Sequence, residues 1–194
     1  MTKEEFEDNY KIYNPILEPI ISQIIKEDNL YCQINETIRW GFGWDDNIAI
    51  TATHDRKTNE IHMNILACID ALNQNRLFDI EYFLIHEMRH IFQNKIVEKY
   101  KEGIETDVDK ELIERWIYEI DHYIKSLDQN GNENLEYFKQ DIEFDAYAFS
   151  FAVMKYKYKD VELLWVPDLY KKEWKETFDS TVDYWIDIFT KENL

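Results

Sequence analysis

The sequence predicts an α+β fold, in which an N-terminal helix and a small antiparallel sheet are followed by a run of helices. Apolar residues recur at three- and four-residue steps near the N-terminus and through most of the second half, as in amphipathic helices. Between these regions lie short segments rich in β-branched and aromatic residues, separated by polar, turn-forming residues. A chain of 194 residues with this order of elements is most simply a single domain, residues 1–194.

The first helix is predicted to run from about Pro15 to Asn29, because a single apolar stripe passes through it. The stripe consists of Ile16, Leu17, Ile20, Ile21, Ile24 and Ile25. Residues 31–38 are β-forming and are a candidate strand. Residues 40–44 are interpreted as a bend or bulge, because two glycines among them relieve backbone limits.

A β-hairpin is predicted next in the chain. Its strands are expected at residues 48–53 and 60–66, where β-forming side chains are frequent. Residues 54–59 between them are polar and favour a turn.

Four helices are predicted after the hairpin. The first is expected to begin at Asp79, as its N-cap, and to stop at Gly103. The second covers Thr106 to about Gln129, and the third covers about residues 132–158. Pro167 then breaks the chain, and a final amphipathic helix covers about residues 171–189.

The composition excludes several classes of protein. Lys and Arg number 22 against 40 Asp and Glu, which gives a formal net charge of -18. This acidity argues against nucleic acid as a partner, because nucleic-acid binders build basic patches that release counterions. It argues equally against adsorption to anionic lipid. With 45% hydrophobic and 15% aromatic residues, the chain can bury a sizeable core, so disorder is not expected.

The chain is expected to be cytoplasmic and to have no membrane partner. Its first residues lack the basic and apolar regions of a signal peptide. Its strictly apolar runs reach about five residues, far short of the roughly 20 that span a bilayer. Cys32 and Cys68 are the only cysteines and form no CxxC pair, so two buried, reduced thiols are expected.

An HExxH pattern occupies residues 86–90, within a predicted helix with apolar flanks. Residues at i and i+4 lie one above the other on a helix, so His86 and His90 can bind one metal ion. Glu87 lies about 100° round the helix and can take a proton from water that the ion has acidified. Random placement gives this pattern in about one of 70 such chains, so a helix with two chance histidines is the alternative.

Two histidines leave a tetrahedral metal site short of a protein ligand. The best source of a third ligand is the later segment 141–149, in which three carboxylates lie within an otherwise apolar helix. Buried unpaired charge is costly, so these acids require an explanation. A solvated acidic face, common in so acidic a chain, is the alternative.

The two motifs together resemble a known family. HExxH followed by Glu143-x-x-Ala146-x-x-Phe149 is similar to gluzincin-type zincin metallopeptidases, and most closely to the small ImmA/IrrE-like peptidases of bacteria, phages and mobile elements. The resemblance implies that His86, His90 and Glu143 hold one Zn²⁺ ion and that Glu87 is the general base.

The resemblance also implies a zincin-like fold, in which an edge strand of the hairpin borders the cleft. Residues 60–65 fit that role. The sequence departs from the family pattern in two places. About 50 residues separate the two motifs and include the predicted helix 106–129, and Ser150 replaces the Ala that follows the second motif.

Further residues are candidates near such a site. Asp145 is expected as a partner of a ligating histidine or as an alternative ligand, a role also open to Asp141. Tyr82 and Gln93 share the helix face of the two histidines and could donate to a substrate oxygen, with helix packing as the alternative. His62, on the hairpin, is a candidate for substrate binding, with a structural role as the alternative.

The leading hypothesis is a zinc-dependent peptidase (a hydrolase) that cleaves a protein or peptide, preferentially a basic one, docked as an added strand along the hairpin edge. One alternative is a metal-binding protein without catalysis that acts as an interaction module. Another is an acidic mimic of DNA that occupies a basic site on a nucleic-acid-binding protein.

Overall fold

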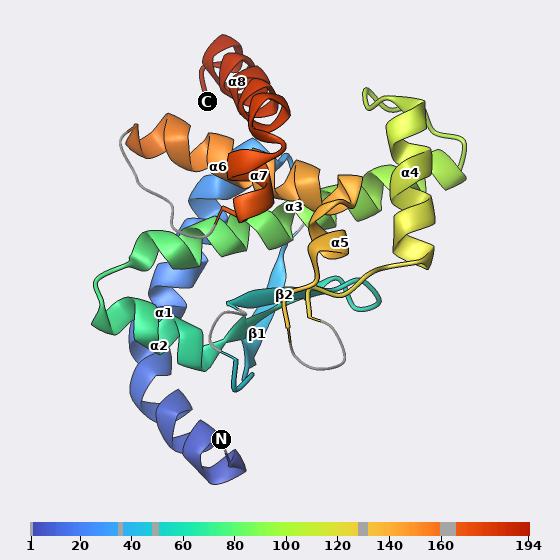
Figure 1. Ribbon diagram of the computed structural model, residues 1–194. Coiled ribbons are helices and arrows are strands. Elements are labelled where there is room, and N and C mark those ends of the chain that lie inside the picture. Colours follow the sequence, from blue (N-terminus) through green and yellow to red (C-terminus); the bar gives the residue numbers. More distant parts are fainter. Residues whose placement is uncertain (1, 35–36, 48–50, 128–131, 160–165) are drawn as a thin grey trace. The chain divides into compact units, whose positions relative to one another are not determined.

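A computed structural model describes residues 2–34, 37–47, 51–127, 132–159 and 166–194 (Figure 1). The predicted α+β order is confirmed: an N-terminal helix, a three-stranded sheet and a mostly helical remainder that includes the HExxH helix. The fold divides into two compact units, residues 1–91 and 92–194, which are described in turn. The single-domain prediction stays a prediction.

The first unit begins with α1 (Lys3–Cys32), which starts earlier than predicted. Thr2 and Glu5 form a capping box, in which each side chain accepts a hydrogen bond from the backbone N–H of the other. This pair satisfies N–H groups at the helix start, so the helix begins there and continues through Pro15 and Pro19. The buried stripe of α1 consists of Leu17, Ile21, Ile24, Asp28 and Cys32.

The sheet contains β1 (Arg39–Gly43), β2 (Ala52–Asp55) and β3 (Glu60–Asn64), in the order β1-β3-β2. β2 and β3 pair antiparallel, as the predicted hairpin requires. β1 pairs with β3 in parallel, so the sheet is mixed and the prediction of a purely antiparallel sheet was wrong. The chain between β1 and β3 is long enough for this crossover because it includes β2.

Three details of the predicted sheet were also wrong. Residues 40–43 form β1, not a bend, and residues 31–32 of the first candidate strand belong to α1. β3 lies at the centre of the sheet, so residues 60–65 do not provide an edge strand; among the described strands, β1 and β2 are the edges. Residues 48–50 of the predicted hairpin, like residues 35–36, lie outside the described residues.

β3 ends where α2 (Ile65–Asn73) begins, and this helix was not predicted. The side chain of Asn64 accepts a hydrogen bond from the N–H of Leu66 and so caps the helix. A short apolar run fits a strand or a buried helix equally well, so its spacing alone could not separate the two. In Figure 1, α2 lies beside α1.

The HExxH residues lie on α3 (Leu77–Lys101), which begins in the first unit and ends in the second. It is followed by Gly103 in the left-handed region (φ 76°), where glycine carries no Cβ penalty, so the predicted stop is explained. Asp79 lies in the first turn rather than at the N-cap.

The second unit continues with α4 (Lys110–Asp121), α5 (Leu135–Phe138) and α6 (Asp141–Tyr158). The single helix predicted over residues 132–158 is therefore interrupted, and Gln140 is the N-cap of α6. α7 (Asp168–Lys172) and α8 (Lys175–Glu192) complete the unit, and α8 packs along α6.

One apolar cluster joins α3, α4 and α6. Its buried members are Ile96 and Val97 of α3, Ile113 and Trp116 of α4, and Ile142 of α6. α6 itself is buried on almost every side, as expected of a helix that other helices surround. Among the described helices, the longest apolar stretches are too short or too charged to cross a membrane.

Truncation in this cluster should be costly. Ile113→Ala removes a fully buried side chain and leaves a cavity, so we expect a loss of about 2–5 kcal/mol in the free energy of unfolding. The same substitution at Ile104, which is half exposed, should change it by about 0.5 kcal/mol or less. Urea denaturation of both variants measures the difference, and equal losses would contradict this account of the core.

Candidate metal centre

All five residues of the HExxH pattern are buried in α3. His86, Glu87 and His90 are each at most 7% exposed, and so are the apolar neighbours that fix this face of the helix, including Leu84 and Ile85. Ionisable groups are seldom buried unless they are paired or bind metal. Their burial agrees better with a functional cluster than with chance histidines on a solvated face.

The two histidines converge as the spacing predicts. The Nε2 atoms of His86 and His90 lie 3.1 Å apart, and the rings are nearly perpendicular at 89°. Two nitrogens that share one tetrahedral Zn²⁺, at bonds of about 2.0–2.1 Å, would be separated by about 3.3 Å. The pair therefore fits one ion with little adjustment.

Glu143 lies on α6 in the second unit and is fully buried. The hydroxyl of Tyr123 donates to its Oε1 at 2.7 Å. Burial raises the pKa of Tyr137 well above its ordinary value, and the adjacent charge of Glu143, to which its hydroxyl is also hydrogen-bonded, adds to the shift. A carboxylate that accepts from two phenols is held in a defined orientation.

Sequence reasoning missed both tyrosines. Tyr123 follows α4 and Tyr137 lies in the short α5, so neither shares a helical face with Glu143. No local sequence pattern could have predicted these contacts of the two tyrosines with Glu143, because they depend on how the chain turns between α4 and α6.

Asp145 and Gln93 connect α6 to the C-terminal part of α3. The side-chain nitrogen of Gln93 donates to Oδ2 of Asp145 at 2.8 Å and to the carbonyl of Ile142 at 2.9 Å. These two bonds use both N–H groups of the amide, so helix packing accounts for Gln93. Gln93 lies one turn beyond His90 on the same helix, and its two acceptors flank Glu143 in the sequence.

Among the described residues, His86, His90 and Glu143 are a group of buried side chains that could hold a metal ion. Two imidazoles and a carboxylate are a donor set that suits Zn²⁺. The remaining predicted site residues occupy different environments. Tyr82 is fully buried in α3, whereas His62 is exposed on β3.

His54 on β2 is a second histidine environment in the first unit. Its Nε2 lies 2.9 Å from Oδ1 of Asn59, an acceptor, so Nε2 carries the proton and Nδ1 is the bare nitrogen. Nδ1 is buried and has no hydrogen-bond partner among the described residues. Burial, with a smaller contribution from the charge of His90, lowers the pKa of His54 to about 4, so the ring is neutral at pH 7.

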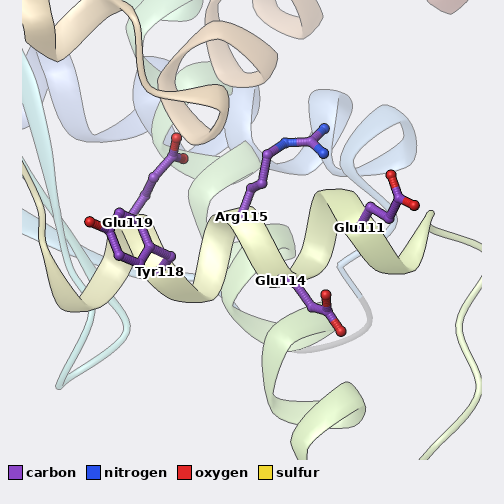
Figure 2. Close-up of a pocket in the computed structure, with 5 residues that line it drawn as sticks. All are labelled: Glu111, Glu114, Arg115, Tyr118 and Glu119. Carbon is purple, nitrogen blue, oxygen red and sulfur yellow. The ribbon is translucent and has the colours of Figure 1, made fainter.

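A shallow hollow on α4 contains none of the motif residues. It is lined by Glu111, Glu114, Arg115, Tyr118 and Glu119 (Figure 2). Its acids face solvent or neighbouring helices of the second unit, and no histidine is among the residues that line it. We therefore place the candidate chemistry on α3 and α6, not in this hollow.

Comparisons with known proteins do not assign a family. No protein-family model, curated protein or solved structure gave a significant match to the chain. The resemblance to gluzincin-type metallopeptidases therefore depends on the two motifs.

The bond between α3 and α6 can be tested with a matched pair of variants. Gln93→Leu removes a buried hydrogen bond to a carboxylate, so we expect the free energy of unfolding to fall by about 1.5–3 kcal/mol. Gln74→Leu removes the same type of bond, to Asp70, at the surface and should cost about 0.5 kcal/mol or less. Urea denaturation separates the two, and equal costs would contradict a structural role for Gln93.

His54 should make stability depend on pH. The unfolded histidine binds a proton near pH 6.5, whereas the folded one binds it only near pH 4. Between these values the unfolded state holds more protons, so stability falls as the pH is lowered, by at most about 1.4 kcal/mol per unit from this group. Urea denaturation in the presence of a chelator should show a shallower slope for His54→Gln, and His62→Gln controls for loss of a sheet histidine. A wild-type slope in His54→Gln would contradict the assignment.

Proposed function

We propose that the protein is a zinc-dependent peptidase that hydrolyses a peptide bond of a protein substrate. The observation that carries this proposal is the convergence of the two histidine Nε2 atoms at 3.1 Å, beside the buried Glu87. Glu143 is proposed as the third ligand. It is a buried acid on α6, and the bonds from Gln93 tie its neighbours to the turn of α3 that follows His90.

His86, His90 and Glu143 would hold a divalent ion, which would supply a Lewis acid for the scissile carbonyl and would lower the pKa of bound water. The carboxylate of Glu87 takes a proton from the attacking water, so that the oxygen bonds to the carbonyl carbon. Glu87 then delivers this proton to the amide nitrogen as the C–N bond breaks, which gives a free amine and a carboxylic acid. Burial of Glu87 excludes bulk water from this proton transfer.

We place the substrate along β2, as an added strand. β2 is an edge of the sheet, so one row of its backbone groups is not paired with another described strand. It carries His54, whose pKa is influenced by the charge of His90, and this links β2 to the histidine pair. The formal charge of -18 favours capture of a cationic peptide, and salt should weaken that capture.

Substitution of the general base should separate catalysis from metal binding. Glu87→Gln keeps the shape of the side chain but cannot take a proton, so we expect zinc content near wild type and cleavage reduced about 100-fold or more. Metal content is measured by mass spectrometry after dialysis against Zn²⁺. Cleavage is measured on a mixture of proteome-derived peptides by counting new termini.

The control is Glu98→Gln, the same change at an exposed position on α3, which should cleave like wild type. His86→Ala should lose both zinc and cleavage. Cleavage by Glu87→Gln at the wild-type rate would disprove the general-base role. Zinc binding without cleavage by the wild type would favour a metal-binding interaction protein, and absence of zinc binding would overturn the metal site itself.

A further inference from the structure

Glu143 is held by a phenol that comes from outside its own helix. Tyr123 donates to Oε1 of Glu143 at 2.7 Å, and although the Tyr123 side chain is 40% exposed, the carboxylate it reaches is fully buried. The ring of Tyr123 packs edge-on against Tyr137, with centroids 6.2 Å apart. This contact fixes the direction from which the hydroxyl approaches.

The backbone next to Tyr123 is fixed to the start of α6. Oε1 of Gln140 accepts from the N–H of Ile124 at 3.0 Å, and Nε2 of Gln140 donates to the carbonyl of the same residue at 3.0 Å. One buried amide thus satisfies both backbone groups of the residue after Tyr123. Gln140 precedes Glu143 by three residues, so the donor and its acceptor are held by one short segment.

α4 is anchored at the same place. The two oxygens of Glu119 accept from the N–H groups of Asp141 at 2.8 Å and Ile142 at 2.9 Å, in the first turn of α6. These N–H groups have no partner within the helix, so the carboxylate caps it. Arg115, one turn earlier, pairs with Asp141 at 2.5 Å. In Figure 2 the side chains of Glu119 and Glu114 leave α4 in opposite directions, so α4 uses one face for this anchor.

We propose that Tyr123 is a positioning residue of the metal centre, an inference that depends on the proposed role of Glu143 as a ligand. The hydroxyl of Tyr123 would hold the carboxylate of Glu143 in the orientation in which it faces the two histidines. α4 and the segment that follows it serve to hold this hydroxyl in place. Groups of this kind orient ligands and tune metal affinity.

Tyr123→Phe removes the hydroxyl and keeps the ring. We expect the affinity for Zn²⁺, measured by competition with a chromophoric chelator, to fall by about 10-fold or more. Tyr118→Phe is the matched control, because Tyr118 is exposed on α4 with its ring stacked on His122. It should bind Zn²⁺ like wild type.

Cobalt substitution gives a readout that a loss of packing would not produce. Without the hydroxyl, the carboxylate of Glu143 can turn relative to the two histidines, which would change the geometry of the ligand set. The visible d–d bands of bound Co²⁺ depend on the geometry of its ligands, so they should change in wavelength or intensity in Tyr123→Phe and match wild type in Tyr118→Phe. Thermal unfolding of the metal-free variants checks that both remain folded.

A double variant shows whether the hydroxyl acts through Glu143. Glu143→Gln retains both histidines, so residual Zn²⁺ binding is measurable, and it should be weaker than in wild type. Adding Tyr123→Phe to Glu143→Gln should cause no further loss. Glu119→Gln, which leaves only one oxygen to accept from the two N–H groups, should also weaken Zn²⁺ binding, whereas Glu111→Gln, exposed on α4, should not.

The outcomes separate the two proposals. If Glu143→Gln binds Zn²⁺ as tightly as wild type, the ligand assignment fails. If Glu143→Gln weakens binding but Tyr123→Phe matches Tyr118→Phe in affinity and in cobalt spectrum, the ligand stands and the role of Tyr123 is overturned. An equal loss from Tyr123→Phe in both backgrounds would also overturn it, because the hydroxyl would then act elsewhere.

Discussion

The bonds from Gln93 to α6 are the constraint on which the second unit depends. The side-chain amide of Gln93 donates to both a backbone carbonyl and a carboxylate of α6. These two bonds fix the position of α6 along the C-terminal part of α3. A shift of α6 by one residue would break both bonds and bury their groups unsatisfied, at about 1–3 kcal/mol each. The apolar cluster around Ile113 and Trp116 stabilises the packing of the helices. It does not fix their register in the same way, because apolar contacts are not directional.

The contacts made by the three acids of α6 explain why they lie within an otherwise apolar helix. Asp145 is the acceptor of the Gln93 amide, and Glu143 accepts the hydroxyl of Tyr123. Asp141, at the start of the helix, pairs with Arg115 and remains partly exposed. The three carboxylates that looked alike in the sequence therefore have three separate roles. A solvated acidic face does not describe them, because two of the three are buried.

The sequence was informative wherever a residue type and its spacing decide the outcome locally. The i and i+4 histidines converge because helix geometry alone brings them together. The glycine stop after α3 and the β2–β3 hairpin were predicted for the same reason. The early start of α1 was also readable, since Thr2 and Glu5 have the spacing of a capping box. The sequence did not predict β1, α2 or the two tyrosines around Glu143, because each depends on partners that are distant in the chain.

The contacts of α4 and Tyr123 give a physical reason for the long separation between the HExxH motif and the motif that contains Glu143. In the sequence, the helix between them was only a departure from a compact pattern. In the structure, that insertion reaches back to the start of α6 through Glu119, and its following segment places Tyr123 on Glu143. A buried carboxylate needs hydrogen-bond donors, because burial without them is costly, and the donors to Glu143 come from outside α6. The inserted chain supplies those donors. α4 is therefore better understood as part of the shell that supports Glu143 than as an appendage, and two of the residues that line its hollow, Arg115 and Glu119, make the contacts to α6.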